Sequence, residues 1–116
     1  MDTLLSVAEL AELESTLLPA LERHHLRLLA HGLRTLQAVA GRQQGPPPGL
    51  EQIEAWALEQ PAIASDAPFV HAFASQLHAT GHQLSAIAAD AGSSALALEL
   101  ADLSSWAQAQ ADARVR

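Results

Sequence analysis

The chain has 116 residues and a mass of 12.2 kDa, which is the size of one domain. Alanine (25) and leucine (20) far outnumber valine, isoleucine and threonine, which total 11, and this composition favours helix over a β-sandwich or barrel. The absence of cysteine excludes thiol catalysis and disulfides, and a formal charge of −7 argues against general binding to nucleic acid or anionic membranes.

The first predicted helix covers residues 7–15. Ser6 followed by Glu9 has the spacing of a capping box, which marks a helix N-terminus. One side of this helix is apolar and carries Val7, Leu10, Leu13 and Leu17. Pro19 then favours a break over one long kinked helix, with Thr16 capping the next helix and Pro19 in its first turn.

The second predicted helix covers residues 17–40 and stops at Gly41. At about 100° per residue, its side chains separate into two faces. The apolar face holds Leu18, Leu21, His25, Leu28, Leu29, Gly32, Leu36 and Val39. The opposite face gathers Arg23, His24, Arg27, His31, Arg34 and Arg42.

This basic face contains four of the six cationic residues of the chain. Guanidinium groups fork onto paired oxygens, so the face predicts a site for an acidic partner or an anion. The candidate residues are Arg23, Arg27, His31 and Arg34. The alternative is that nearby acids neutralise the face across a helix pair, namely Glu9, Glu12, Glu14 and Glu22.

A linker occupies residues 41–49, where three consecutive prolines favour an extended and semi-rigid backbone. We interpret it as a stiff connection between helices rather than as a recognition motif for an aromatic-lined groove. A third helix is predicted over residues 50–59 and ends at Pro61. Its inner edge carries Leu50, Ile53, Trp56 and Ala57.

A fourth helix is predicted from an Asp66 cap, with Pro68 in the first turn, to Asp90. Its expected buried stripe is Phe69, Phe73, Leu77, Thr80, Leu84, Ile87 and Ala91. Gly92 closes it, and a fifth helix is expected to start at Ser93 or Ser94. That helix carries Leu96, Leu100, Leu103 and Trp106, and the segment 108–116 is expected to fray.

Three histidines on the fourth helix form the second candidate site. His78 and His82 are one turn apart, a spacing that can chelate a divalent metal, and His71 lies on the same line two turns earlier. No acid lies between Asp66 and Asp90, and the histidine line points away from the apolar stripe. We therefore expect three solvated histidines, with metal binding as the alternative.

The segment 84–94 matches a loose helix-turn-helix pattern with Gly92 at the turn. A recognition helix starting near Ser94 would present Glu99 and Asp102 to DNA and no cation before Arg114, so it would repel phosphate. We interpret the pattern as a tight corner between helices. The sequence also lacks a glycine-rich phosphate loop and a nucleophile elbow, which argues against an enzyme.

These observations predict an all-α fold over residues 1–116, a compact bundle of four to five antiparallel helices in a single domain. The expected function is a non-catalytic interaction module, such as an adaptor, assembly factor or small regulator, that needs no cofactor. The alternative is a small-ligand or metal-binding protein that uses the three histidines.

A protein partner is expected, and neither nucleic acid nor membrane. We expect a homodimer, because Leu26 and Leu33 lie toward the edge of the apolar face of the second helix and Leu98 departs from the inner stripe of the fifth, and a second copy would cover them. With no basic signal before Arg23 and no apolar span, a cytoplasmic protein is expected.

Overall fold

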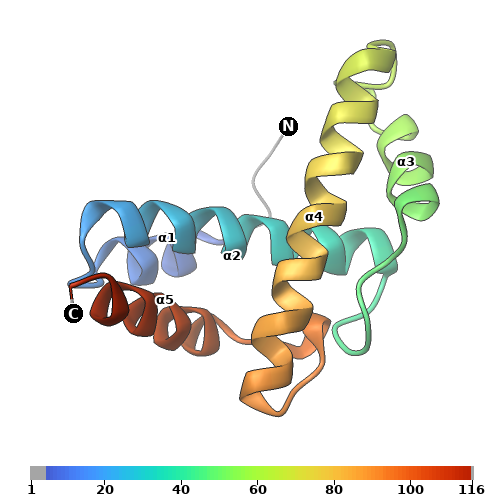
Figure 1. Cartoon of the computed structure of the whole chain (residues 1–116). Helices are drawn as coiled ribbons and strands as arrows, with labels where there is room; N and C mark the ends of the chain where they lie inside the picture. Colours follow the sequence, from blue (N-terminus) through green and yellow to red (C-terminus); the bar gives the residue numbers. More distant parts are fainter. Residues whose placement is uncertain (1–4, 116) are drawn as a thin grey trace.

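The computed structural model describes residues 5–115, and within them it holds five α-helices, one short 3-10 helix and no strand (Figure 1). The elements in chain order are α1 (Val7–Glu14), α2 (Ala20–Ala40), α3 (Leu50–Leu58), α4 (Ala67–Ala91), the 3-10 helix (Ala95–Ala97) and α5 (Leu100–Arg114). The predicted all-α bundle of four to five helices is therefore confirmed.

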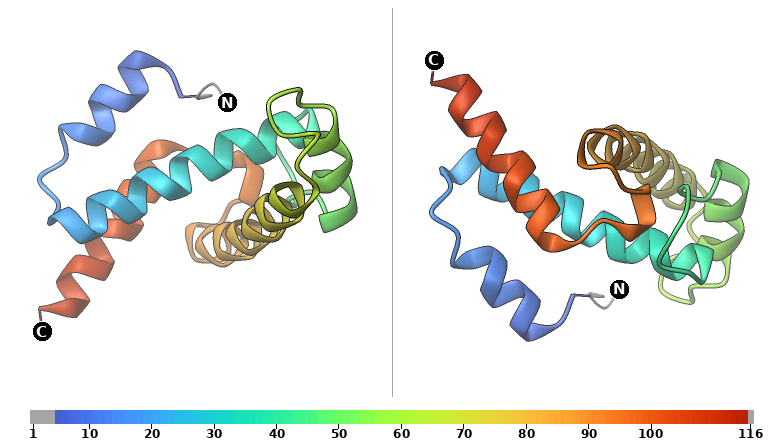
Figure 2. Two further views of the ribbon diagram at one scale, coloured as in Figure 1. Left: turned by 90° about the horizontal axis from the view of Figure 1, so that it is seen from above. Right: turned by 90° about the horizontal axis from the view of Figure 1, so that it is seen from below.

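The long helix α2 is the centre of the bundle, because each of the other four α-helices packs against it. α1 and α5 run along its N-terminal half, whereas α3 and α4 lie at its C-terminal half (Figures 1 and 2). α4 crosses α2 steeply, so its first half, with α3 beside it, projects away from the rest (Figure 1). The molecule measures 45 × 26 × 25 Å.

Local sequence signals set the first two helices. Ser6 and Glu9 form the predicted capping box, in which each side chain accepts a hydrogen bond from the backbone N–H of the other residue. The predicted break is also present, since α2 begins only after Pro19, its N-cap residue. Thr16 does not cap α2, as its hydroxyl donates to the Leu13 carbonyl and closes α1 instead.

The start of the fifth helix was predicted wrongly. A helix from Ser93 or Ser94 is replaced by the 3-10 turn and an extended Leu98, and α5 begins at Leu100 behind a capping box of Glu99 and Asp102. The reason is burial: the irregular backbone lets both Leu96 and Leu98 enter the core. Residues 108–114, where fraying was expected, are helical as part of α5.

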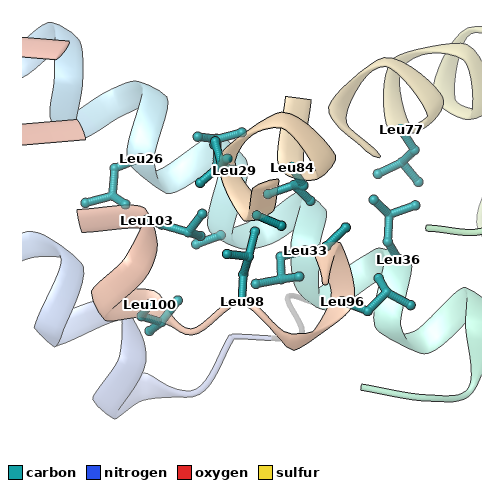
Figure 3. Close-up of a cluster of buried hydrophobic side chains, with 14 of the residues drawn as sticks. Leu26, Leu29, Leu33, Leu36, Leu77, Leu84, Leu96, Leu98, Leu100 and Leu103 are labelled. Atoms are coloured by element: carbon teal, nitrogen blue, oxygen red, sulfur yellow. The ribbon is translucent and has the colours of Figure 1, made fainter. Parts of the chain in front are cut away.

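The core lies where α2 meets α4, α5 and the 3-10 segment (Figure 3). Leu26 and Leu33, placed at the edge of the apolar face by the sequence, are 0% exposed, while Leu21 and Leu28, placed inside it, are 61% and 55% exposed. The prediction of the buried face was thus wrong by part of a turn. Leu96, Leu98 and Leu103 come from far along the chain to cover the side that carries Leu26 and Leu33.

Two smaller corrections concern α1 and α4. On α1 only Leu13 is buried, and the expected inner residues Val7 and Leu17 are exposed, because α1 packs mainly against α2. On α4 the buried stripe includes Val70, which clusters with Ala57 of α3, and Ala74, which belongs to the main core, rather than Phe69. The remaining buried residues of α4 are Leu77, Gly81, Leu84, Ile87 and Ala88, and Ala91 is exposed.

Two glycines allow the close crossing of α2 and α4. A Cβ atom at Gly32 would lie 2.6 Å from the Thr80 methyl carbon, closer than atoms can approach without a shift. A Cβ atom at Gly81 would lie 3.1 Å from Pro47 in the linker and 3.6 Å from Leu36. The helices and the proline run therefore meet at positions that have no side chain.

Candidate protein-binding surfaces

The basic face of α2 is largely occupied by the chain's own acids. Arg27 forms an ion pair with Glu14, and Arg34 forms one with Glu9, so both bonds join α2 to α1. The hydrogen bond from Arg34, with those from Ser6, holds the pKa of the Glu9 carboxyl below its usual value. The structure thus shows the neutralising contacts of the alternative interpretation at two of the four candidate residues.

The other two candidates on this face are half-buried. Arg23 has no carboxylate partner within the described part of the chain, and the His31 carbonyl accepts a hydrogen bond from the Thr35 hydroxyl. Arg42 lies beyond the helix end, where its guanidinium donates to the carbonyls of Gln44 and Pro46 and braces the linker. That an acidic partner or anion binds this face stays a prediction.

The histidines of α4 do not come together as a set of three. The rings of His78 and His82 meet edge to face with centroids 4.7 Å apart, whereas His71 is exposed and lies 3.9 Å from Glu54 of α3. Across residues 5–115 no group of three or more histidines and acids is placed to hold a metal ion. Metal analysis of the purified protein, with and without His78→Ala, tests the metal alternative.

A groove of about 530 Å³ opens between the first turns of α2, the middle of α4 and the end of α5. His25 lies in it and accepts a hydrogen bond of 3.1 Å from the Gln83 side-chain amide. The His25 ring also packs edge to face against the Trp106 ring, with the two ring centroids 5.1 Å apart. The exposed Leu21 forms part of its wall. The groove is concave and of mixed polarity, and its residues come from three helices.

An ion pair between α2 and α5 forms part of the wall of this groove. The Glu22 carboxylate is buried and accepts two hydrogen bonds, of 2.5 and 2.8 Å, from the Arg114 guanidinium. These bonds hold the pKa of Glu22 below its usual value, against the opposing effect of burial. The pair fixes the last turn of α5 to the first turn of α2.

A different surface lies at the projecting end of α3 and α4, residues 50–73, which we call the tip. The Phe73 ring stacks on the rings of Trp56 and Phe69, with centroid distances of 6.3 and 6.2 Å. We call these three stacked rings the aromatic ladder. Phe69 is 48% exposed, and Trp56 and Phe73 are half-buried over the small cluster of Ala57, Ile63 and Val70. The buried cluster thus supports two rings of the ladder, and the third, Phe69, is open to solvent.

Charge is unevenly divided along the chain. Residues 43–113 contain eight acids and no lysine or arginine, whereas residues 5–42 contain four acids and four arginines. Four of the eight acids belong to the tip: Glu51, Glu54, Glu59 and Asp66. The tip therefore combines a partly exposed aromatic ladder with acidic charge that no arginine of residues 5–115 neutralises.

Comparison with known proteins gives a family. The family model described as NDH complex assembly factor CRR9 matches residues 5–114, which include every helix described above. The chain belongs to this family. Searches of curated proteins and of solved structures find no match.

Membership of this family agrees with the coarse expectation of an assembly factor that contacts other proteins. None of the described helices is both long enough and apolar enough to cross a membrane. Leu26, Leu33 and Leu98 are all buried within one chain, so they no longer provide an argument for a homodimer.

Sequence reasoning missed the tip as a surface. It placed Phe69 and Phe73 in the buried stripe of the fourth helix. The signal that could have found it is the run of 71 residues without lysine or arginine that includes all four of the chain's large aromatics. The groove had no sequence signal, since its walls come from three distant segments.

Proposed function

We propose that this protein is a non-catalytic assembly factor for the NDH complex and that it acts by binding a component of that complex during assembly. The observation that carries this proposal is the family match, which extends over residues 5–114 and hence over the whole described bundle. A match of this extent covers the core and both surfaces rather than a short shared motif.

The surface of the protein supports binding as the mode of action. The described chain exposes large apolar side chains at several places, among them Leu21, Leu28, Leu58 and Phe69. Exposed apolar and aromatic groups at a rigid surface are typical of protein contacts, because burying them against a partner releases water. They are carried on packed helices, so little conformational entropy is lost on binding.

Deletion of the gene in its native cells tests the proposal. We expect the amount of fully assembled NDH complex, measured on native gels, to fall severalfold and to return when the intact chain is supplied. Unchanged levels of the assembled complex in the deletion strain would contradict an assembly role. Normal assembly with a loss of complex activity would indicate a different function.

We propose that the assembly factor does not turn over a substrate. A variant with His25→Gln keeps a hydrogen-bonding group opposite Gln83 but has no imidazole to move protons. It should restore assembly of the NDH complex as well as the intact chain does. Loss of assembly with this variant, at an unchanged melting temperature, would indicate chemistry at the groove.

The homodimer and the cytoplasmic location stay predictions. Sedimentation at micromolar concentration measures the first, and a single 12 kDa species at high concentration would contradict it. Cell fractionation measures the second.

A further inference from the structure

We propose that the tip, residues 50–73, is a docking site for a basic amphipathic segment of a partner protein, with an arginine or lysine of that segment seated against the aromatic ladder. The proposal rests on the proposed function, and it adds the surface that makes the contact and the chemistry of what is bound.

The acids of the tip are not neutralised by arginines of the described chain. Glu51, Glu59 and Asp66 are exposed, and within the described chain none of them has a basic partner. Three of the four glutamates of α1 and α2 differ in this respect, since Glu9, Glu14 and Glu22 are each paired with an arginine. The tip carries four acids, no lysine or arginine and one histidine, His71 beside Glu54, and this excess of acid favours a partner of opposite charge.

The rings of the ladder can attract a cation. The faces of Trp and Phe rings carry negative potential, and a guanidinium or ammonium group over such a face is attracted to it. Phe69 offers a ring that is 48% exposed at the open end of the stack. Trp56 and Phe73 hold that ring in place from behind, so the contact surface exists before the partner arrives.

The position of the tip also suits docking. α3 and the projecting half of α4 stand clear of α1 and α5 (Figures 1 and 2), and α2 is the other helix that packs against α3. A partner helix can approach it without disturbing the core of Figure 3. Apolar contacts would then lie at the centre of the interface and acidic contacts around it, which is the usual arrangement of protein interfaces.

A peptide titration tests the surface itself. The probe is a synthetic amphipathic helix of leucine, alanine and arginine, and its partner probe has glutamate in place of every arginine. We expect the arginine peptide to shift backbone amide resonances of residues 50–73 in the full-length protein, and the glutamate peptide to bind at least tenfold more weakly. Equal binding of both peptides, or shifts confined to the groove around His25 and Trp106, would overturn the proposal.

Paired variants locate the contact. Phe69→Ser removes the exposed ring, and Glu59→Lys reverses one tip charge at a position where a cation suits the end of α3. The matched controls are Leu17→Ser, which removes an exposed apolar side chain between α1 and α2, and Glu12→Lys on α1. We expect each tip variant to weaken binding of the arginine peptide at least fivefold and the controls to leave it unchanged, at unaltered melting temperatures.

The same four variants separate this proposal from the assembly role. If the intact chain restores the NDH complex in the deletion strain, the tip variants should restore it poorly and the controls fully. Full restoration by both tip variants would overturn the docking site while leaving the assembly role intact. Failure of the deletion to alter the complex would overturn the assembly role, and the peptide titration would still decide whether the tip binds basic segments.

Discussion

At the residue scale, the crossing of α2 and α4 depends on a missing side chain. Gly32 lies under the methyl group of Thr80, whose hydroxyl is tied to the Gln76 carbonyl one turn earlier. Threonine is branched at Cβ and stiff, so its methyl group cannot swing aside easily. A glycine in mid-helix normally costs stability, and here the close packing of the two helices offsets that cost.

We predict that Gly32→Ala destabilises the protein by about 1–3 kcal/mol, even though alanine is the better helix former, because the added methyl group overlaps the Thr80 methyl group. Adding Thr80→Ala to this variant should restore most of the loss. Denaturant unfolding of the two single variants and the double variant forms a complete cycle. Additive effects of the two substitutions would show that the contact does not limit the crossing.

The carboxyl groups of Glu9 and Glu22 predict a pH dependence with a definite sign. The pKa of each is lowered in the folded protein by its arginine, so the unfolded chain binds more protons in the acidic range. Their contribution to stability is therefore complete above about pH 4.5, the ordinary value for glutamate, and is lost as the pH falls through their folded values.

Thermal melts between pH 6 and pH 3 of the intact chain and of Glu22→Gln measure this effect. We expect the variant to be less stable at pH 6 and the difference to shrink as the pH falls. Glu59→Gln is the control, because this exposed side chain has no ion pair in the described chain. A constant difference across the range would show that the Arg114 pair does not depend on the charge of Glu22.

At the scale of elements, α1 is the most weakly attached helix. It packs mainly against α2, through the buried Leu13, the partly buried Leu10 and two exposed or half-exposed ion pairs. Exposed ion pairs are typically worth about 0 to 1 kcal/mol, so burial of Leu13 is the main attachment along the helix itself. Parts of a protein with few buried contacts open first.

We predict that Leu13→Ala costs about 2–4 kcal/mol in contacts between α1 and α2 and releases α1 without unfolding the rest. Hydrogen exchange should accelerate at residues 7–14 and stay slow in the part of α5 around Leu103. Val7→Ala is the control, as Val7 is exposed on the same helix. Equal acceleration in α1 and α5 would show that the bundle unfolds as one unit.

The elements also show what could be predicted and what could not. Caps and breakers act locally, so Ser6, Pro19, Asp66, Gly41 and Gly92 predicted the ends of α1, α2 and α4 to within a few residues. The buried face of α2 was not predictable in the same way, because both sides of the helix carry leucines. The choice of Leu26 and Leu33 depends on Leu96, Leu98 and Leu103, some 60 to 80 residues later in the chain.

The same limit applied to the candidate surfaces. The pairing of Arg27 and Arg34 with α1 could be predicted, because the break at Pro19 allows α1 to fold back against α2. Neutralisation of the basic face by the acids of α1 was therefore one of the two interpretations. The aromatic ladder needed knowledge of how α3 lies against α4. A shift of the α4 stripe by one residue turned Phe69 from an expected core residue into an exposed one.

At the scale of the whole molecule, the division of charge has a consequence for the rate of partner encounter. Excess acid in residues 43–113 creates a negative potential that reaches beyond contact distance and draws cations toward the tip. Dissolved salt screens this attraction over about 10 Å at 0.1 M. We therefore expect the association rate of the arginine peptide, measured by stopped flow, to fall steeply between 20 mM and 300 mM salt while its dissociation rate changes little. The protein would select its partner first at a distance, by sign of charge, and only then by the shape of the rings it meets.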